Sequence, residues 1–281
     1  YFLLQEAVKS KFEQTILGNL TPDGELLDLE DKNIGPEELR LLCDADDLSS
    51  DLSSSLSSVK QLFLSQNQLC GESIEILSRV KGFTGLVSLY LNNNKIGDEE
   101  AKVLANAELF KNLKCLMLEA NSIGPKGAEA LASSPNFQNL EVLFLDSNPI
   151  GPEGARVVAS SEQLPRLQAL HLDSTGIGDE GIIAIAESPN LMDLKKLYLC
   201  SNKMGDAGAI ALAKSENLKK LNVLSIWRNE IRDEGGQAIA ESQNFMNLER
   251  LYMSLNLIER PVRKIIRGSE LAKRLTTLVM D

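Results

Sequence analysis

Residues 113–148 read LKCLMLEANSIGPKGAEALASSPNFQNLEVLFLDSN, which is one complete unit of a repeat followed by the beginning of the next. The unit is LxxLxLxxN, then an apolar residue and usually a glycine, then a stretch rich in small residues. Its asparagine returns every 27 residues, at Asn67, Asn94, Asn121, Asn148, Asn202, Asn229 and Asn256, with Thr175 in the one remaining place. A period kept without a slip over so many units predicts a stacked repeat protein.

Each part of the unit predicts a local structure. The two leucines of LxL alternate, so they point to one face of a short strand and leave the residue between them on the other face. The asparagine follows the strand, where its amide can bond peptide groups at the turn. A helix then opens. Acidic residues that we expect to cap it are Asp98, Asp179 and Asp206, and prolines that suit its first turn are Pro36, Pro125 and Pro152.

Stacking of these units predicts a curved solenoid. Strands stack about 4.8 Å apart, whereas helices are about 10 Å across, so the stack bends and the strands line its concave side. A second 27-residue series should form a buried spine, namely Phe83, Phe110, Phe137, Leu164, Leu191, Leu218 and Phe245. The predicted fold is a right-handed α/β solenoid of about ten repeats, a horseshoe with a parallel sheet on its concave face and helices on its convex face.

These residues resemble a leucine-rich repeat, and the strand and full helix joined by IGDEG or IGPEGA resemble its ribonuclease-inhibitor-like class. That class includes ribonuclease inhibitors, GTPase-activating proteins of the Ran type, sensor regions of innate immune receptors and effectors of intracellular bacteria. The chain departs from the mammalian inhibitor, which has longer paired repeats rich in cysteine. Its uniform short repeat and four cysteines look more like a bacterial or protist version, such as a bacterial effector.

The two ends differ from the middle of the chain. Leu4, Val8, Phe12, Ile16 and Leu20 are spaced by four, which predicts an amphipathic helix that caps the stack over residues 1–24. The repeat domain then covers residues 25–281. Between its first two units eight residues are inserted, where Leu48, Leu52 and Leu56 predict a short helix. The last strand stops in mid-repeat, so we expect truncation of a longer protein.

Composition excludes several functions. The net charge of −11 disfavours binding to nucleic acid or an anionic membrane, and a single histidine excludes histidine-based metal sites. We expect no metal, no cofactor and no membrane segment. The four cysteines are too sparse for a disulfide scaffold, so we expect them to be reduced in a cytoplasmic protein, or in one translocated into a host cytosol. We further expect Cys115 and Cys200 to be exposed.

The residue between the two strand leucines should face outward on the concave side. Its series concentrates the scarce aromatic residues of the chain, with Phe63, Tyr90, Met117, Phe144, His171, Tyr198 and Tyr252. The only tryptophan, Trp227, lies two positions further along its strand. Cross-strand stacking explains such a series without a ligand. We favour a protein-binding face, because large aromatic side chains dominate binding hot spots.

The next outward position places Glu119, Asp146 and Asp173 on adjacent strands. Their mutual repulsion would be relieved by a basic ligand. A solvated acidic face and a divalent cation site are the alternatives. Lys196, Arg228 and Arg250 make the C-terminal part of the same face more basic.

Catalysis is not expected. The chain has no GxSxG, no phosphate-binding loop and no GxGxxG after a strand. His171 with Cys200 or Asp173 has the composition of a catalytic group, but an open sheet offers no oxyanion hole. The prediction is a monomeric, non-enzymatic scaffold that recognises another protein with a basic patch. The alternatives are a regulator of an enzyme, either an inhibitor of a basic enzyme or a Ran-type GTPase activator, and a structural spacer.

Overall fold

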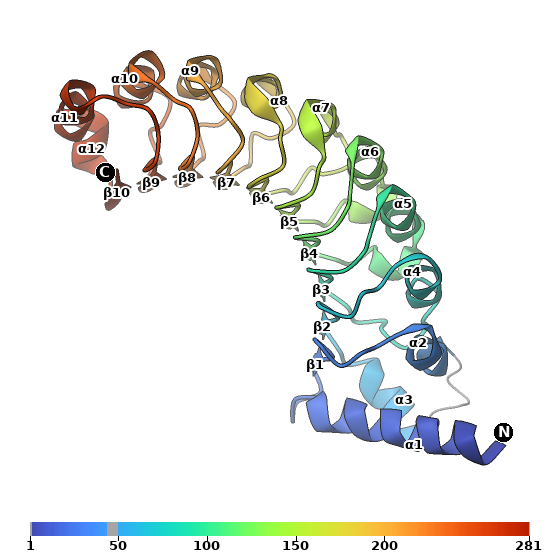
Figure 1. Ribbon diagram of the computed structural model, residues 1–281. Helices are drawn as coiled ribbons and strands as arrows, with labels where there is room; N and C mark the ends of the chain where they lie inside the picture. The colour runs from blue at the N-terminus through green and yellow to red at the C-terminus, as the bar shows by residue number, and fades with distance from the viewer. Residues whose placement is uncertain (1, 44–49, 281) are drawn as a thin grey trace.

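The computed structural model describes residues 2–43 and 50–280, and it forms an arc with strands on the inner side and helices on the outer side (Figure 1). The strands are β1 (Leu26–Asp28), β2 (Gln61–Phe63), β3 (Ser88–Tyr90), β4 (Cys115–Met117), β5 (Val142–Phe144), β6 (Ala169–His171), β7 (Lys196–Tyr198), β8 (Val223–Ser225), β9 (Arg250–Tyr252) and β10 (Thr277–Val279). The helices are α1 (Phe2–Asn19), α2 (Pro36–Cys43), α3 (Ser50–Leu56), α4 (Gly71–Leu77), α5 (Asp98–Asn106), α6 (Pro125–Ala132), α7 (Gly151–Ser160), α8 (Gly178–Glu187), α9 (Asp206–Lys214), α10 (Asp233–Glu241), α11 (Arg260–Gly268) and α12 (Glu270–Arg274), with short 3-10 turns η1 (Glu108–Phe110) and η2 (Pro135–Phe137).

The ten strands form one parallel sheet in the order β1 to β10, which confirms the predicted horseshoe solenoid. The register pairs equivalent positions of successive repeats, so that Leu116 lies beside Leu143, and Leu143 beside Leu170. These leucines are buried, and so is the whole predicted spine from Phe83 to Phe245. Each repeat therefore buries its apolar face only against its neighbours.

The turn asparagines form a ladder that joins successive repeats. Asn148 accepts a hydrogen bond at Oδ1 from the Ile123 N–H (3.0 Å), and its Nδ2 donates to the carbonyls of Leu118 (2.8 Å) and Leu145 (3.1 Å). At the exceptional position, the Thr175 hydroxyl donates to the Leu172 carbonyl (2.6 Å). Threonine thus keeps part of the bonding capacity of asparagine, as the sequence predicts.

The aspartates at the helix starts act differently from the prediction, because each bonds the next repeat and not its own helix. Asp98 Oδ1 accepts from the Gly124 and Gly127 N–H groups (2.7 and 2.8 Å), where α6 begins. Asp179 and Asp206 make the equivalent bonds to α9 and α10. A carboxylate at the start of one helix therefore satisfies the unpaired N–H groups of the following helix.

Helices α7 and α8 begin without such a carboxylate, because the repeat before each has proline in place of aspartate. These helices, α7 and α8, follow the repeats of Pro125 and Pro152, and they start at Gly151 and Gly178 with φ of 62° and 57°. This left-handed conformation suits glycine, which has no Cβ to clash. The choice of aspartate or proline in one repeat therefore accompanies a change in how the next helix begins.

The N-terminal helix α1 lies at the end of the stack, beside β1 and α2 (Figure 1). Phe12 and Ile16 are buried as predicted, whereas Val8 is 38% exposed, so the apolar stripe is shorter than expected. The side chain of Leu4 and the whole of Leu48 lie outside the described residues. The inserted segment does contain the short helix α3, in which Leu52 and Leu56 are buried. The division at residues 24 and 25 stays a prediction.

Candidate functional site

The central column is the series of outward residues in the middle of the strands, and the sheet register places them side by side. Its members from β2 to β7 are Phe63, Tyr90, Met117, Phe144, His171 and Tyr198, and Tyr252 continues it on β9. All seven are half-buried, with one side against neighbours and one side open. Ser225 on β8 is buried and interrupts the series.

Five rings of the central column form two stacks, which Met117 separates. Phe63 and Tyr90 lie with ring centroids 3.9 Å apart and planes 6° apart. His171 is stacked between Phe144 at 3.5 Å and Tyr198 at 4.0 Å. The cross-strand stacking considered from the sequence is therefore present, and it orients the rings while the side chains stay half-buried.

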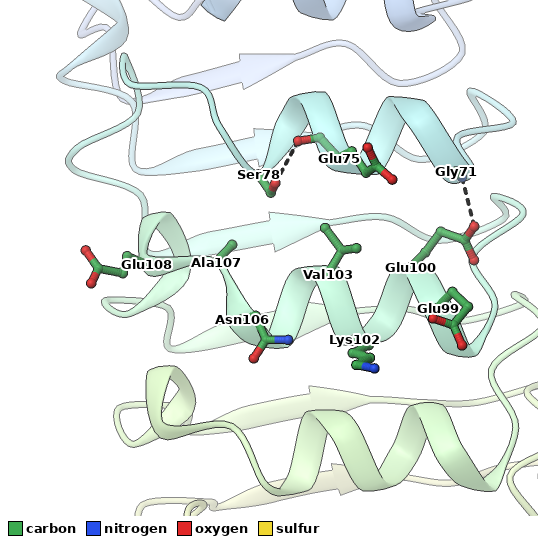
Figure 2. Close-up of a pocket in the computed structure, with 10 residues that line it drawn as sticks. All are labelled: Gly71, Glu75, Ser78, Glu99, Glu100, Lys102, Val103, Asn106, Ala107 and Glu108. Atoms are coloured by element: carbon green, nitrogen blue, oxygen red, sulfur yellow. Dashed lines mark hydrogen bonds between the residues drawn. The ribbon is translucent and has the colours of Figure 1, made fainter.

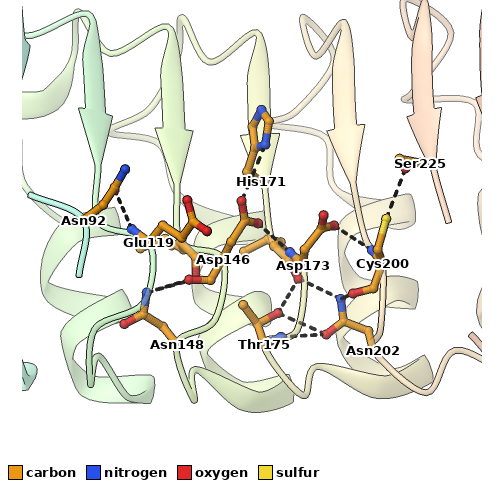
Figure 3. A network of polar contacts seen from close by, with 12 residues as sticks. Asn92, Glu119, Asp146, Asn148, His171, Asp173, Thr175, Cys200, Asn202 and Ser225 are labelled. Carbon is orange, nitrogen blue, oxygen red and sulfur yellow. Dashed lines mark hydrogen bonds and ion pairs between the residues drawn. The ribbon is translucent and has the colours of Figure 1, made fainter. Parts of the chain in front are cut away.

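The strand-end row consists of Asn92, Glu119, Asp146, Asp173 and Cys200, each two residues beyond a member of the central column and just after a strand (Figure 3). The sequence predicts that this row faces outward, and the structure corrects that prediction. Asp146 is only 9% exposed, and its Oδ1 accepts from the Asp173 N–H (2.6 Å). Asp173 Oδ1 accepts in turn from the Cys200 N–H (2.7 Å), and Asn92 Oδ1 from the Glu119 N–H (2.9 Å). This row is a second ladder between strands, so Asp146 and Asp173 do not form a solvated acidic face.

Three ionisable side chains, Asp146, His171 and Asp173, lie close together at the centre of this row. The Asp146 Oδ2 to His171 Nδ1 distance is 3.7 Å, so the imidazole faces Asp146 and is held there by the two flanking rings. Burial, together with the Asp146 charge, raises the pKa of Asp173 to about 6, although the Cys200 N–H and His171 act to lower it. Asp146 and Asp173 therefore repel each other as predicted, and the hydrogen bonds that they accept from backbone N–H groups offset part of this repulsion.

Cys200 does not meet the expectation of an exposed thiol. It is 2% exposed, because Cys200 lies in the turn after β7 and its side chain contacts Ser225 on β8. Its Sγ lies 3.1 Å from the Ser225 Oγ, and burial raises the pKa of the thiol to about 12. Cys115 is half-buried, and burial raises the pKa of its thiol to about 11. Neither thiol has the low pKa that a nucleophile needs.

The C-terminal part of the concave face carries the predicted basic side chains. Lys196 and Arg250 are exposed on β7 and β9, on either side of the buried Val223. Arg228 is exposed in the turn after β8, where its φ is 55°. Beside it Trp227 is 38% exposed, which makes it the most accessible aromatic residue of the predicted binding face.

The convex side carries open grooves between helices. One lies between α4 and α5, where Glu100 accepts from the Gly71 N–H (2.9 Å) (Figure 2). Its polar rim is mostly acidic, with Glu75, Glu99, Glu100 and Glu108 beside Lys102. No group of three or more histidine, cysteine, aspartate or glutamate side chains suited to a metal ion occurs among the described residues.

A further series with the 27-residue spacing, absent from the sequence prediction, is a serine ladder. Its members are Ser134, Ser161, Ser188, Ser215 and Ser242, all buried. Ser242 Oγ donates to the Ala213 carbonyl (2.6 Å) at the end of α9 and accepts from the Asn244 N–H (3.2 Å). The spacing is visible in the sequence, but nothing in it shows that the hydroxyl bonds a carbonyl of the preceding repeat.

Comparison with known proteins agrees with this architecture. The family model described as Leucine Rich repeat matches residues 85–105, 111–132, 138–159, 164–186, 190–213 and 217–240. The chain is a leucine-rich repeat protein. Among solved structures, internalin C2 from Listeria monocytogenes is similar to it, with 25% identity, a TM-score of 0.56, and coverage of 82% of this chain and 83% of that chain. No curated protein sequence matches this leucine-rich repeat protein significantly.

The family and the fold together support a protein–protein interaction scaffold. Membership of the ribonuclease-inhibitor-like class, an effector role and a cytoplasmic location stay predictions. Within residues 2–43 and 50–280, no helix has the length and apolar content needed to cross a bilayer.

Proposed function

We propose that this leucine-rich repeat protein recognises a partner protein through its concave face, with the central column and Trp227 as the contact residues. The observation that carries the proposal is the stack of half-buried rings Phe144, His171 and Tyr198. The core behind the sheet is filled by the strand leucines and the spine, and these rings lie outside it. Rigid aromatic side chains lose little entropy on binding and bury large areas.

The partner that fits this face best has a basic patch. Glu119, Asp146 and Asp173 follow the adjacent strands β4, β5 and β6, and the chain as a whole carries a charge of −11. A positive group brought near Asp146 and Asp173 would offset their mutual repulsion. Asp146 is buried, whereas Glu119 and Asp173 are half-exposed and accessible to a partner.

The test is affinity capture with matched variants. The face variant carries Phe144→Ala and Tyr198→Ala, and the control variant carries Lys126→Ala and Arg156→Ala on the convex side, where both side chains are exposed. We expect a partner that is retained by the wild type and the control and lost from the face variant. Loss from the control alone would move the recognition surface to the helices and end the proposal.

An inhibitor of a basic enzyme or a GTPase activator would use the same face, so the partner recovered decides between a general scaffold and an enzyme regulator. Inhibition of a captured basic enzyme, or faster GTP hydrolysis by a captured GTPase, would each identify a regulator.

A further inference from the structure

Charge on the concave face is divided by strand. The acidic pole consists of Glu119, Asp146 and Asp173, which follow β4, β5 and β6, and the basic pole of Lys196, Arg228 and Arg250, on or after β7, β8 and β9. No member of the basic pole forms an ion pair with a residue that the structure describes. Within the same part of the chain, the Glu119 carboxylate makes no hydrogen bond or ion pair either. Both poles therefore have charge that folding leaves unneutralised.

Tyr198 lies at the boundary of the two poles, on β7 with Lys196 and beside β6, which Asp173 follows. Burial raises the pKa of its phenol, and the Arg250 charge lowers that pKa while the Asp173 charge raises it. The phenol thus lies within the electrostatic reach of one residue from each pole. On one side its ring stacks on His171, and on the other side the column is interrupted at Ser225.

The two poles adjoin at β6 and β7, because Asp173 follows β6 and Lys196 lies on the neighbouring strand β7. Their centres, at β5 and β8, are three strand spacings apart, which is about 14 Å. This exceeds the Debye length of about 8 Å at physiological salt, so solvent ions screen the two centres from each other. A ligand with one sign of charge would be attracted at one end of the column and repelled at the other.

We propose that the segment bound to the concave face is bipolar, with a cationic side chain over the acidic pole, an anionic side chain over the basic pole, and an apolar side chain against Tyr198 between them. This inference rests on the proposed function and adds the chemistry and the orientation of the partner. A distance of about 14 Å corresponds to four residues of extended chain or to about nine residues of helix. The segment lies across the strands, because the charge of the concave face changes from negative to positive from β4 to β9 and not along a single strand.

The experiment uses three blocked five-residue peptides, each with a central phenylalanine flanked by alanines. One has lysine at the first position and glutamate at the last, one has lysine at both, and one has glutamate at both. Binding to the full chain is followed at low salt by chemical shift changes in NMR spectra. We expect the mixed peptide to bind at least about threefold more tightly than either peptide of one charge.

A charge-reversal variant makes the test specific. In Lys196→Glu with Arg250→Glu, both poles are acidic, so the peptide with two lysines should become the tightest ligand. The matched control, Lys126→Glu with Arg156→Glu, makes the same change in net charge on the convex side and should keep the wild-type order. Because all four side chains are exposed, these variants should fold.

Three results would overturn the bipolar inference: equal affinity of the mixed and two-lysine peptides for the wild type, an unchanged order in the reversal variant, or no binding of any peptide. The proposed function fails separately, if the partner captured by the wild type is also retained by the Phe144→Ala, Tyr198→Ala variant. If the face variant loses that partner but the three peptides show no order of affinity, the binding face is supported and only the bipolar inference fails.

Discussion

Leu143 and Phe144 are neighbours on β5, yet they belong to two different regions of the molecule. Leu143 lies in the continuous core between sheet and helices, whereas Phe144 lies half-exposed on the concave face and stacks on His171. The core side repeats with little variation, because each leucine must fit against its equivalent in the next repeat. The concave side varies from phenylalanine to histidine to serine. The difference indicates that stability depends on one face of the strands and that the other is free to specialise.

Leu143→Ala should have the largest effect on stability, because it removes a side chain from the core. The side chain is fully enclosed at the centre of the stack, so its removal should lower the free energy of unfolding by about 2 to 5 kcal/mol. The measurement is the midpoint of urea unfolding by circular dichroism. A loss no larger than that of Tyr198→Ala would show that the two faces do not differ as described.

Asn148→Ala should come next, because the turn ladder belongs to the stable region although its residues are polar. The substitution leaves the buried Ile123 N–H and the Leu118 carbonyl without their side-chain partner, at a cost of about 2 to 3 kcal/mol. Gln138→Ala, at an exposed amide, is the matched control and should change the midpoint little. Similar midpoints for the two variants would show that the asparagine ladder does not contribute to the stability of the fold.

Tyr198→Ala should separate binding from stability. The loss of free energy of unfolding should stay below about 1 kcal/mol, since the ring is half-exposed. The loss of binding free energy should reach about 2 kcal/mol, mainly as faster dissociation of the captured partner. Surface-binding kinetics measures the latter. A variant with normal dissociation and a lower unfolding midpoint would place Tyr198 in the stable region.

The sequence alone predicts most of the fold, because the 27-residue period forces equivalent residues into register. It also predicts which aromatic residues share the central column. It fails just beyond the strands, which are only three residues long. Alternation of faces, extrapolated to Asp146 and Cys200, predicts exposure, but the chain has already turned and both are buried. The asparagine bonds to the neighbouring repeat could be expected, but other contacts between repeats could not, since no local pattern shows that Asp98 bonds α6 or that His171 faces Asp146.

Asp173 lies at the border of the two regions, and its titration gives the smallest and most specific test. Its pKa is raised from 3.8 to about 6 in the folded protein, so between these values the folded state binds the proton and the unfolded state does not. Stability contributed at this site should therefore fall as pH rises from 4 to 6 and stay low above that range. Asp173→Asn keeps an oxygen for the Cys200 N–H and removes the charge. At pH 7 it should raise the free energy of unfolding by about 1 to 2 kcal/mol, a range that allows for the partial exposure of the carboxylate.

The measurement is the urea midpoint of both proteins at several pH values from 4 to 7.5. The advantage of the asparagine variant should shrink as the pH falls, because the wild-type carboxylate then becomes neutral as well. A difference that stays constant or grows toward pH 4 would show that Asp173 is an ordinary solvated carboxylate. In that case the strand-end row would belong to the concave face, as its sequence position alone suggests. The stable region would then begin only at the turn asparagines.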